Sequence, residues 1–322
     1  MQRISREKAI HYVFDHRSQP VLTVEPGEHF LVETRDALSG KIQSEKDLLT
    51  PENMKPYSEY EPALSNPLSG PVLVRGVECG DLLAIYIDEV IPAGNGVTAI
   101  KPGQGGLCHS NRWSIHVDPI TRIIHHQVGP SGTFRDGKAV FSDTMSWDIQ
   151  PFIGTIGVAP QIEVETSAVG QGIWGGNWDC RDMCSESILF LNVYHDGALL
   201  FIGDVHGSQG DGEWSGVANE MAADVLLRCE VIKRKKIPCP RIEKPGSLVC
   251  FVSDRPLEVA IERAMECLLE WIVDEYGMDP REAYMLFSVC PDFRINVYQM
   301  VKLGSISYTA GAEFPKKYLP KN

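Results

Sequence analysis

Residues 201–216 concentrate four side chains that can bind a metal or carry a proton. Their sequence, FIGDVHGSQGDGEWSG, places Asp204, His206, Asp211 and Glu213 among several glycines. The apolar run ALLFI leads into the segment, so we expect it at the end of a core strand, where loops project functional groups from a rigid scaffold. If the strand stays extended, Asp204 and His206 share one face, and a carboxylate beside an imidazole is typical of a divalent-metal site. On these residues alone, an acidic glycine-rich surface turn remains the alternative.

A second polar cluster, GGNWDC, occupies residues 175–180. Its glycines let backbone approach closely, Asn177 offers an amide and Asp179 offers a carboxylate. The run SILFLNVYHDG follows it, and we expect this run to form a hairpin with ALLFIGDVHG through the HDG turn. The hairpin would bring Asp179 near the first cluster only if a loop leads it back, so a simple hairpin turn remains the alternative reading of GGNWDC.

The remaining cysteines and histidines carry less information. None of the nine cysteines forms a C-x-x-C pair, which excludes a zinc ribbon or a thioredoxin-type motif and favours a reduced, cytoplasmic chain. We expect Cys180 and Cys184 to be bystanders, because no Ser-His-Asp or Cys-His context supports a nucleophile. His125 and His126 are adjacent, so on a strand they face opposite sides. Ordinary strand or loop positions are expected for the histidines at 11, 16, 29, 109 and 116.

Composition limits the partners. The chain has 322 residues, of which 43% are hydrophobic and 23% charged, so it can bury a large core in one domain or two closely packed ones. Its formal charge of −13 opposes binding to nucleic acid or to anionic membranes. The longest apolar runs are too short to cross a bilayer, and no secretory signal is visible at the N-terminus.

Short strands broken by glycine turns dominate the pattern. Helices are predicted over residues 254–277 and from Asp279 onward. A third is predicted over WSGVANEMAADVLLR at residues 214–228, although the end of this segment reads directly into a strand. We therefore expect a β-dominated α+β fold of packed, sandwich-like sheets. Residues 1–240 would form a β-rich body that carries the site, and residues 241–322 a smaller C-terminal α+β portion, unless the two form one continuous domain.

The two clusters together match a known signature. GGNWD followed by GDVHGSQGDGE resembles the acetamidase/formamidase family, in which GGNxD precedes GDxHxxQGDGE. The resemblance extends over most of the chain, through QPVLTVEPGEHFLVETRDALSG, NPLSGPVLVRGVECGDLLAIYIDEV, PFIGTIGVAP and AYMLFSVCPDFRI. Two departures stand inside it, because Trp174 and Trp178 replace the histidine and methionine common in the family. Gly207 and Ser208 likewise replace the frequent Ala-Ala pair. We expect the tryptophans to alter the pocket and hence the substrate.

The resemblance implies a metal-dependent hydrolase that cleaves short amides to carboxylate and ammonia. It assigns seven residues to the site: Asn177, Asp179, Asp204, His206, Gln209, Asp211 and Glu213. Asp179, Asp204 and His206 would hold a divalent metal, expected to be zinc, and Glu213 or Asp211 would move the proton. Asn177 or Gln209 would hydrogen-bond the amide or its oxyanion. The division of roles among the acidic residues stays open.

Two alternatives and an assembly state accompany this prediction. The chain could hydrolyse another C–N bond, as in a lactam, a carbamate or a larger amide, or it could be a metal- or ligand-binding relative without turnover. A small amide is the expected partner, and a homodimer is the expected assembly.

Overall fold

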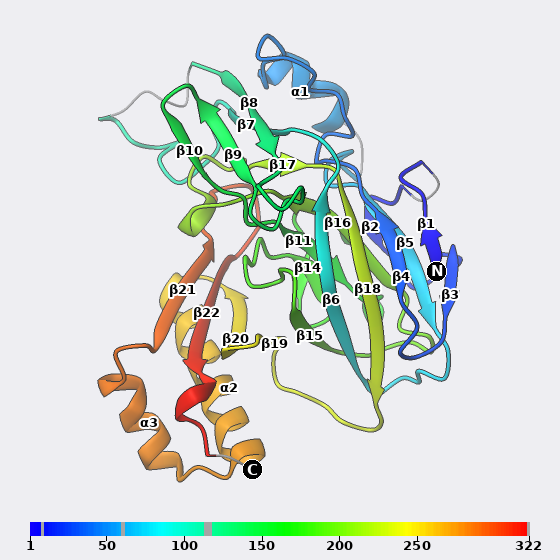
Figure 1. Cartoon of the computed structure of the whole chain (residues 1–322), viewed down its shortest axis with the longest axis vertical. Coiled ribbons are helices and arrows are strands. Elements are labelled where there is room, and N and C mark those ends of the chain that lie inside the picture. The colour runs from blue at the N-terminus through cyan, green and yellow to red at the C-terminus, as the bar shows by residue number, and fades with distance from the viewer. Residues whose placement is uncertain (8–9, 59–61, 113–117, 321–322) are drawn as a thin grey trace.

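A computed structural model describes residues 1–7, 10–58, 62–112 and 118–320 (Figure 1). Its strands gather into a nine-stranded, an eleven-stranded and a two-stranded sheet, and its two longest helices lie near the C-terminus. The predicted β-dominated α+β class is therefore confirmed. In the described segments, no helix combines the length and apolar character needed to cross a membrane. His116 lies outside the described residues.

The nine-stranded sheet is built around two long antiparallel strands, β6 (Leu82–Pro92) and β18 (Ala223–Ile232), which run side by side in Figure 1. In spatial order its strands are β1 (Gln2–Ile4), β4 (Phe30–Glu33), β18, β6, β15 (Ser187–Asn192), β19 (Arg241–Glu243), β20 (Ser247–Asp254), β22 (Tyr308–Pro315) and β21 (Arg294–Gln299). The sheet thus continues from the body into the C-terminal portion through β19, which pairs with β15 on one side and β20 on the other.

The eleven-stranded sheet carries both polar clusters. Its main path is β10 (Met145–Asp148), β9 (Lys138–Ser142), β8 (Ile120–Gln127), β7 (Gly96–Ile100), β17 (Glu220–Met221), β16 (Leu200–His206), β11 (Phe152–Gly157), β14 (Gly175–Asn177) and β13 (Gln171–Gly172), with β5 (Leu68–Val74) paired to β16 and β3 (Leu22–Val24) paired to β5. A separate two-stranded sheet joins β2 (Val13–Phe14) to β12 (Glu165–Thr166).

The main hydrophobic core unites residues of both large sheets. Phe30, Ile85 and Val225 come from the nine-stranded sheet, and Ile156 and Phe201 come from the eleven-stranded one. Each of these side chains is almost fully buried. Strands such as β11 and β16 are buried at every position, so they form a rigid base for the polar groups at their ends.

Helices cover the C-terminal strands at the lower end of the view in Figure 1. Helix α2 (Leu257–Tyr276) packs Ala264, Leu268 and Ile272 into a second core that includes Leu248 and Phe314 of β20 and β22. Short helices occur at α1 (Pro51–Ser58), η1 (Asp211–Glu213) and η2 (Lys316–Tyr318).

The predicted helix boundaries near the C-terminus are largely confirmed. Helix α2 ends at Gly277, whose left-handed conformation provides the expected C-cap, but no side chain caps its N-terminus. Helix α3 (Pro280–Val289) begins after Asp279, which accepts hydrogen bonds from the amides of Arg281 and Glu282.

Two local predictions are wrong. Residues 214–228 do not form a helix, because they contain β17 and the first part of β18. Strand β18 lies between β4 and β6, and its residues are alternately buried and partly exposed. The expected hairpin of residues 187–206 is also absent, since β15 pairs with β6 and β19 whereas β16 pairs with β11, β5 and β17. The turn between β15 and β16 thus crosses from one sheet to the other.

Candidate metal centre

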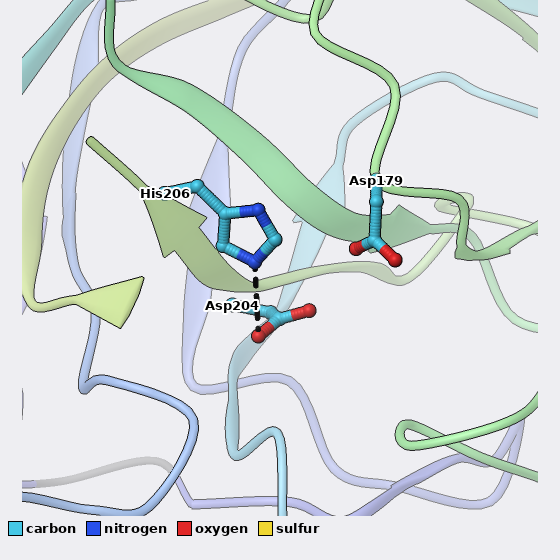
Figure 2. A group of neighbouring side chains, drawn as sticks. All are labelled: Asp179, Asp204 and His206. Carbon is cyan, nitrogen blue, oxygen red and sulfur yellow. Dashed lines mark ion pairs between the residues drawn. The ribbon is translucent and has the colours of Figure 1, made fainter. Parts of the chain in front are cut away.

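Three buried side chains meet beside strand β11 of the eleven-stranded sheet. Asp204 and His206 lie on β16, and Asp179 follows β14. One ligand atom of each lies within 4.8 Å of the others, and each residue is at most 2% exposed. Figure 2 shows the two carboxyl groups and the imidazole ring around a common space, with His206 Nε2 3.6 Å from Asp204 Oδ1.

Strand β11 brings the two clusters together because it lies between β14 and β16. Its Thr155 pairs with Asn177 on one side and Gly203 on the other. The neighbouring Gly154 leaves room for the carboxyl groups: a Cβ there would lie 3.0 Å from Asp179 Oδ1 and 3.0 Å from Asp204 Oδ2. The sheet order, rather than the predicted hairpin, joins Asp179 to the site.

The backbone of both aspartates is unusual. Asp179 has φ 49° and Asp204 has φ 55°, in the left-handed region that residues other than glycine rarely adopt. Such a conformation costs about 1–3 kcal/mol for each residue and persists only where the surrounding structure imposes it, as at many functional sites. The fold therefore aims both carboxyl groups inward against a local preference.

Hydrogen bonds fix the orientation of Asp204. Its Oδ2 accepts from Asn66 Nδ2 at 2.7 Å and from Thr155 Oγ1 at 2.9 Å. The Thr155 hydroxyl also lies 3.1 Å from Asn177 Oδ1. Oδ1 of Asp204 remains directed at the imidazole of His206.

Asp179 is held from one side only. Gln299 donates from Nε2 to Asp179 Oδ2. The other oxygen, Oδ1, is buried and accepts no hydrogen bond from the amide, hydroxyl or amine groups of the described chain. An uncompensated buried carboxylate oxygen is costly, so this atom calls for a cation or a proton.

The imidazole of His206 has a defined tautomer. Its Nδ1 donates to Gln209 Oε1 at 2.9 Å, while Gln209 Nε2 donates to the carbonyl oxygens of Asp179 at 3.1 Å and Tyr298 at 2.7 Å. Nε2 of His206 faces Glu220 Oε2 at 3.1 Å. A donor on Nδ1 leaves Nε2 free to bind a metal, as in many histidine ligands.

The electrostatics favour a positive charge at this point. Burial, together with the charge of Asp204, raises the pKa of Asp179 to about 7. Burial also raises the pKa of Glu220, and burial together with Asp179 raises that of Glu213 well above its ordinary value. Burial opposes protonation of His206, but Glu220 and Asp204 outweigh it and raise the pKa of the imidazole.

These side chains line a cavity of about 90 Å³. Its lining also includes five further polar residues and one lysine: Asn66, Asn177, Gln299, Glu213, Glu220 and Lys101. Burial lowers the pKa of Lys101, whereas Glu220 and Glu213 act to raise it. The remaining walls are mainly apolar: Ala37, Leu38, Ile42, Leu49, Val97, Ala99, Ala168, Val217, Val301, Leu303 and Ile306.

Five of the seven predicted site residues line this cavity, and two do not. Asp211 is exposed and pairs with Arg181 outside the cavity, although Glu213 is only two residues further on. Gln209 lies behind His206, where all its polar atoms contact protein groups. A larger open groove of about 990 Å³ borders Gln209 and Arg181, but it contains none of the three predicted metal ligands.

The two tryptophans do not line the cavity, which corrects the expectation that they shape the pocket. Trp174 is buried against Phe14, with ring centroids 4.7 Å apart, and Trp178 is buried against Phe251 at 4.8 Å. Both rings belong to the main core between the sheets. Their effect on a substrate can therefore only be indirect.

Several site residues escaped the sequence pattern. Glu220 was hidden because its segment reads as a helix, and Lys101 stands in the glycine-rich run KPGQGG, which carries no specific signature. Strand periodicity offered a signal for Lys101. Every second residue of a strand faces the same side, and Val97, Ala99 and Lys101 have this spacing and all line the cavity.

Comparison with known proteins identifies the family. The model of the acetamidase/formamidase family matches residues 2–171 and 168–311. The chain belongs to the acetamidase/formamidase family. Among solved structures, an acetamidase from Yersinia enterocolitica aligns with a TM-score of 0.84 and 34% identity, covering 98% of this chain and 91% of the other. An acetamidase from Bacillus halodurans aligns with a TM-score of 0.83 and 28% identity, covering 98% of both chains.

A curated relative gives a partial match. The acetamidase of Mycolicibacterium smegmatis is 25% identical over 263 residues, which cover 66% of this chain and 63% of the relative. The chain therefore spans less than two thirds of the length of the curated relatives it matches.

Proposed function

We propose that this member of the acetamidase/formamidase family is a metal-dependent hydrolase of short aliphatic amides, which it converts to carboxylate and ammonia. One observation carries the proposal: Asp179, Asp204 and His206 converge, buried, on a small cavity that also contains the carboxyl group of Glu213. Three protein ligands with space beside them are the usual arrangement of a catalytic divalent metal.

The donor set fits a divalent cation, and we propose zinc. Asp179 Oδ1 lacks a donor, Nδ1 of His206 is committed to Gln209, and the site contains two carboxylates and an imidazole but no thiolate. Asp179, Asp204 and His206 would hold the ion, and Asn66, Thr155, Gln299 and Gln209 would orient these ligands. When bound, such an ion supplies Lewis-acid chemistry and acidifies water.

Glu213 is the proposed proton carrier. Its carboxyl group faces Asp179, and burial with the neighbouring charge raises its pKa, which makes it a stronger base than an exposed glutamate. It would accept the proton of the attacking water and return that proton to the nitrogen that leaves as ammonia. Asn177, whose Nδ2 donates to the carbonyl oxygen of Ala168, would position Thr155 and the cavity wall rather than the substrate.

The cavity supports a small substrate. Its volume of about 90 Å³ is that of roughly three water molecules in the liquid, far below the 300–1,000 Å³ of sites for drug-sized ligands. The three predicted metal ligands cluster together, and apolar side chains form much of the remaining lining. An amide head with a short alkyl group matches this division.

The test is ammonia release from formamide, acetamide and propionamide, with and without a chelator, together with elemental analysis of the protein purified without added metal. Glu213→Gln preserves size but cannot accept a proton, so kcat should fall by about 10²–10⁴-fold with the metal content unchanged. His206→Ala should lose both metal and activity. A metal-free protein with full amidase activity would refute the proposal.

Asp211→Asn is the matched control, because Asp211 is an exposed carboxylate two residues before Glu213 and pairs with Arg181. Its kcat should remain close to that of the wild type. If Glu213→Gln removes the metal instead, Glu213 is a ligand and the base must be sought in Glu220.

A homodimeric assembly and a cytoplasmic location remain predictions. Light scattering coupled to size-exclusion chromatography measures the first, and fractionation of the source cells measures the second.

A further inference from the structure

Glu213 is the last residue of η1, a single short turn of three residues. Regular secondary structure therefore does little to fix its position. Gly212 has φ 80° and Glu213 has φ 47°, so two consecutive residues adopt left-handed conformations inside the short turn η1. Within the turn, the amide of Glu213 donates to Gly210 O at 3.2 Å, and its carbonyl accepts from Gly216 at 2.8 Å. A turn of this kind needs external contacts to fix one side-chain direction.

Those contacts come from the glycine-rich loop that follows β7. The amide of Gly106 donates to Trp214 O at 2.8 Å. The Trp214 ring lies directly on Gly106, since a Cβ there would lie 1.9 Å from Cε3 of Trp214. A Cβ on Gly105 would lie 2.5 Å from Trp214 O. Only glycine therefore permits this approach, which joins loop 101–106 to the residue next to Glu213.

The same ring also lies close to the turn itself. A Cβ on Gly212 would lie 2.9 Å from Nε1 of Trp214, and Gly212 O accepts from the amide of Met300 at 2.9 Å. Although Trp214 is 49% exposed, its ring thus lies close to two glycines that belong to different loops. Trp214 therefore contacts both the loop that follows β7 and the turn that carries Glu213.

We propose that Trp214, Gly105 and Gly106 form a clasp that sets the position of the Glu213 carboxyl group, which makes Trp214 a positioning residue for the amidase reaction. This inference rests on the proposed role of Glu213 as the proton carrier. Loop 101–106 also supplies Lys101 to the lining of the cavity, so the clasp joins two parts of the lining that are distant in sequence. Its loss would let Glu213 move while the metal ligands, which lie on β16 and after β14, stay in place.

The first experiment compares Trp214→Ala with Trp214→Phe in zinc-loaded protein. Because a displacement of 1 Å in a catalytic group can cost about 10²-fold in rate, Trp214→Ala should lower kcat to this extent. KM, zinc content and the circular dichroism spectrum should change little. Trp214→Phe retains a ring on Gly106 and should recover most of kcat. A kcat for Trp214→Ala within about threefold of the wild type would overturn the clasp.

A double-mutant cycle shows whether Trp214 acts through Glu213. If it does, Trp214→Ala should have almost no further effect in the Glu213→Gln background, since the group it positions is already inactive. Full additivity of the two changes would overturn the proposal. If Glu213→Gln alone keeps full activity, the proposed role of Glu213 fails, and this result is distinct from failure of the clasp.

Gly106→Ala tests the contact from the opposite side. The added methyl group collides with the Trp214 ring, so kcat should fall, and combination with Trp214→Ala should remove the collision and restore kcat to that of Trp214→Ala alone. Gly210→Ala is the matched control, because it is in the Glu213 loop, has φ −80° and has open space around its Cα. A fall in kcat for Gly210→Ala equal to that for Gly106→Ala would contradict the proposal.

Discussion

Replacement of Thr155 by valine tests whether the hydrogen bonds around the aspartates tune the proposed metal site. Thr155 is fully buried on β11, and its hydroxyl lies 2.9 Å from Asp204 Oδ2 and 3.1 Å from Asn177 Oδ1. One hydroxyl proton serves one acceptor at a time, and the bond to a carboxylate is the stronger. Valine keeps the shape and removes one of the two donors to Asp204, leaving Asn66 alone.

The expected effect is on metal affinity. Loss of an orienting group next to a ligand typically weakens metal binding by about 10–100-fold, which corresponds to about 1.4–2.8 kcal/mol. Competition between the apoprotein and a chromophoric chelator measures this change, and kcat at saturating zinc should stay within about threefold of the wild type. Thr34→Val is the control, because Thr34 is equally buried but bonds to the backbone of Ala223.

Two results would refute this reasoning. Zinc affinity of Thr155→Val equal to that of Thr34→Val would mean that the hydroxyl does not act on Asp204. A loss of kcat at saturating zinc, with the fold intact, would mean that Thr155 takes part in the reaction itself.

Cys180 is buried, and burial raises the pKa of its thiol. Replacement of Cys180 and Cys184 by serine should therefore leave kcat within a few-fold of the wild type while stability falls by about 1–3 kcal/mol. A loss of several hundred-fold in kcat with the fold intact would place a thiol in the site. Burial opposes ionisation of Asp81, but its hydrogen bonds, including one from Lys233 at 2.9 Å, outweigh burial and lower its pKa. The contribution of Asp81 to stability is therefore present above the ordinary pKa of 3.8 and is lost as pH falls through the lowered pKa of the folded state. Asp81→Asn should destabilise the fold by about 1–3 kcal/mol at pH 7 in chemical denaturation. The difference in stability between this variant and the wild type should shrink below about pH 4. A difference that does not depend on pH would contradict this account.

Local sequence patterns predicted the centre of the site but not its surroundings. Asp204 and His206 lie together on one buried strand, as their spacing predicts, although Asp204 has φ 55° instead of the extended backbone that the prediction assumed. Asp179 was assigned correctly to their neighbourhood by resemblance, but through a hairpin that does not exist. Strand β11 joins the two clusters by lying between β14 and β16. The order of strands across a sheet cannot be predicted from any short segment of sequence.

Tertiary context explains the other errors. The alanine-containing run before Leu226 favours a helix when considered alone. In the structure it belongs to a strand that pairs with β4 and β6 and is buried at alternate positions, so sheet pairing overrides the local helix propensity. This error concealed Glu220, which pairs with His206 across β17 and β16. Asp211 and Glu213 look equivalent in sequence, but the turn directs one outward and the other into the cavity.

The hydrogen bonds that orient the two aspartates join very distant parts of the chain, and this has a consequence for folding. Asn66 is 138 residues from Asp204, and Gln299 is 120 residues from Asp179. Contacts of such high sequence separation form slowly, because loop-closure entropy opposes them until the intervening sheets have assembled. During synthesis on the ribosome, the full set of donors becomes complete only after β21 has emerged. Binding of zinc at the proposed site during refolding should therefore lag behind the recovery of sheet signal in circular dichroism.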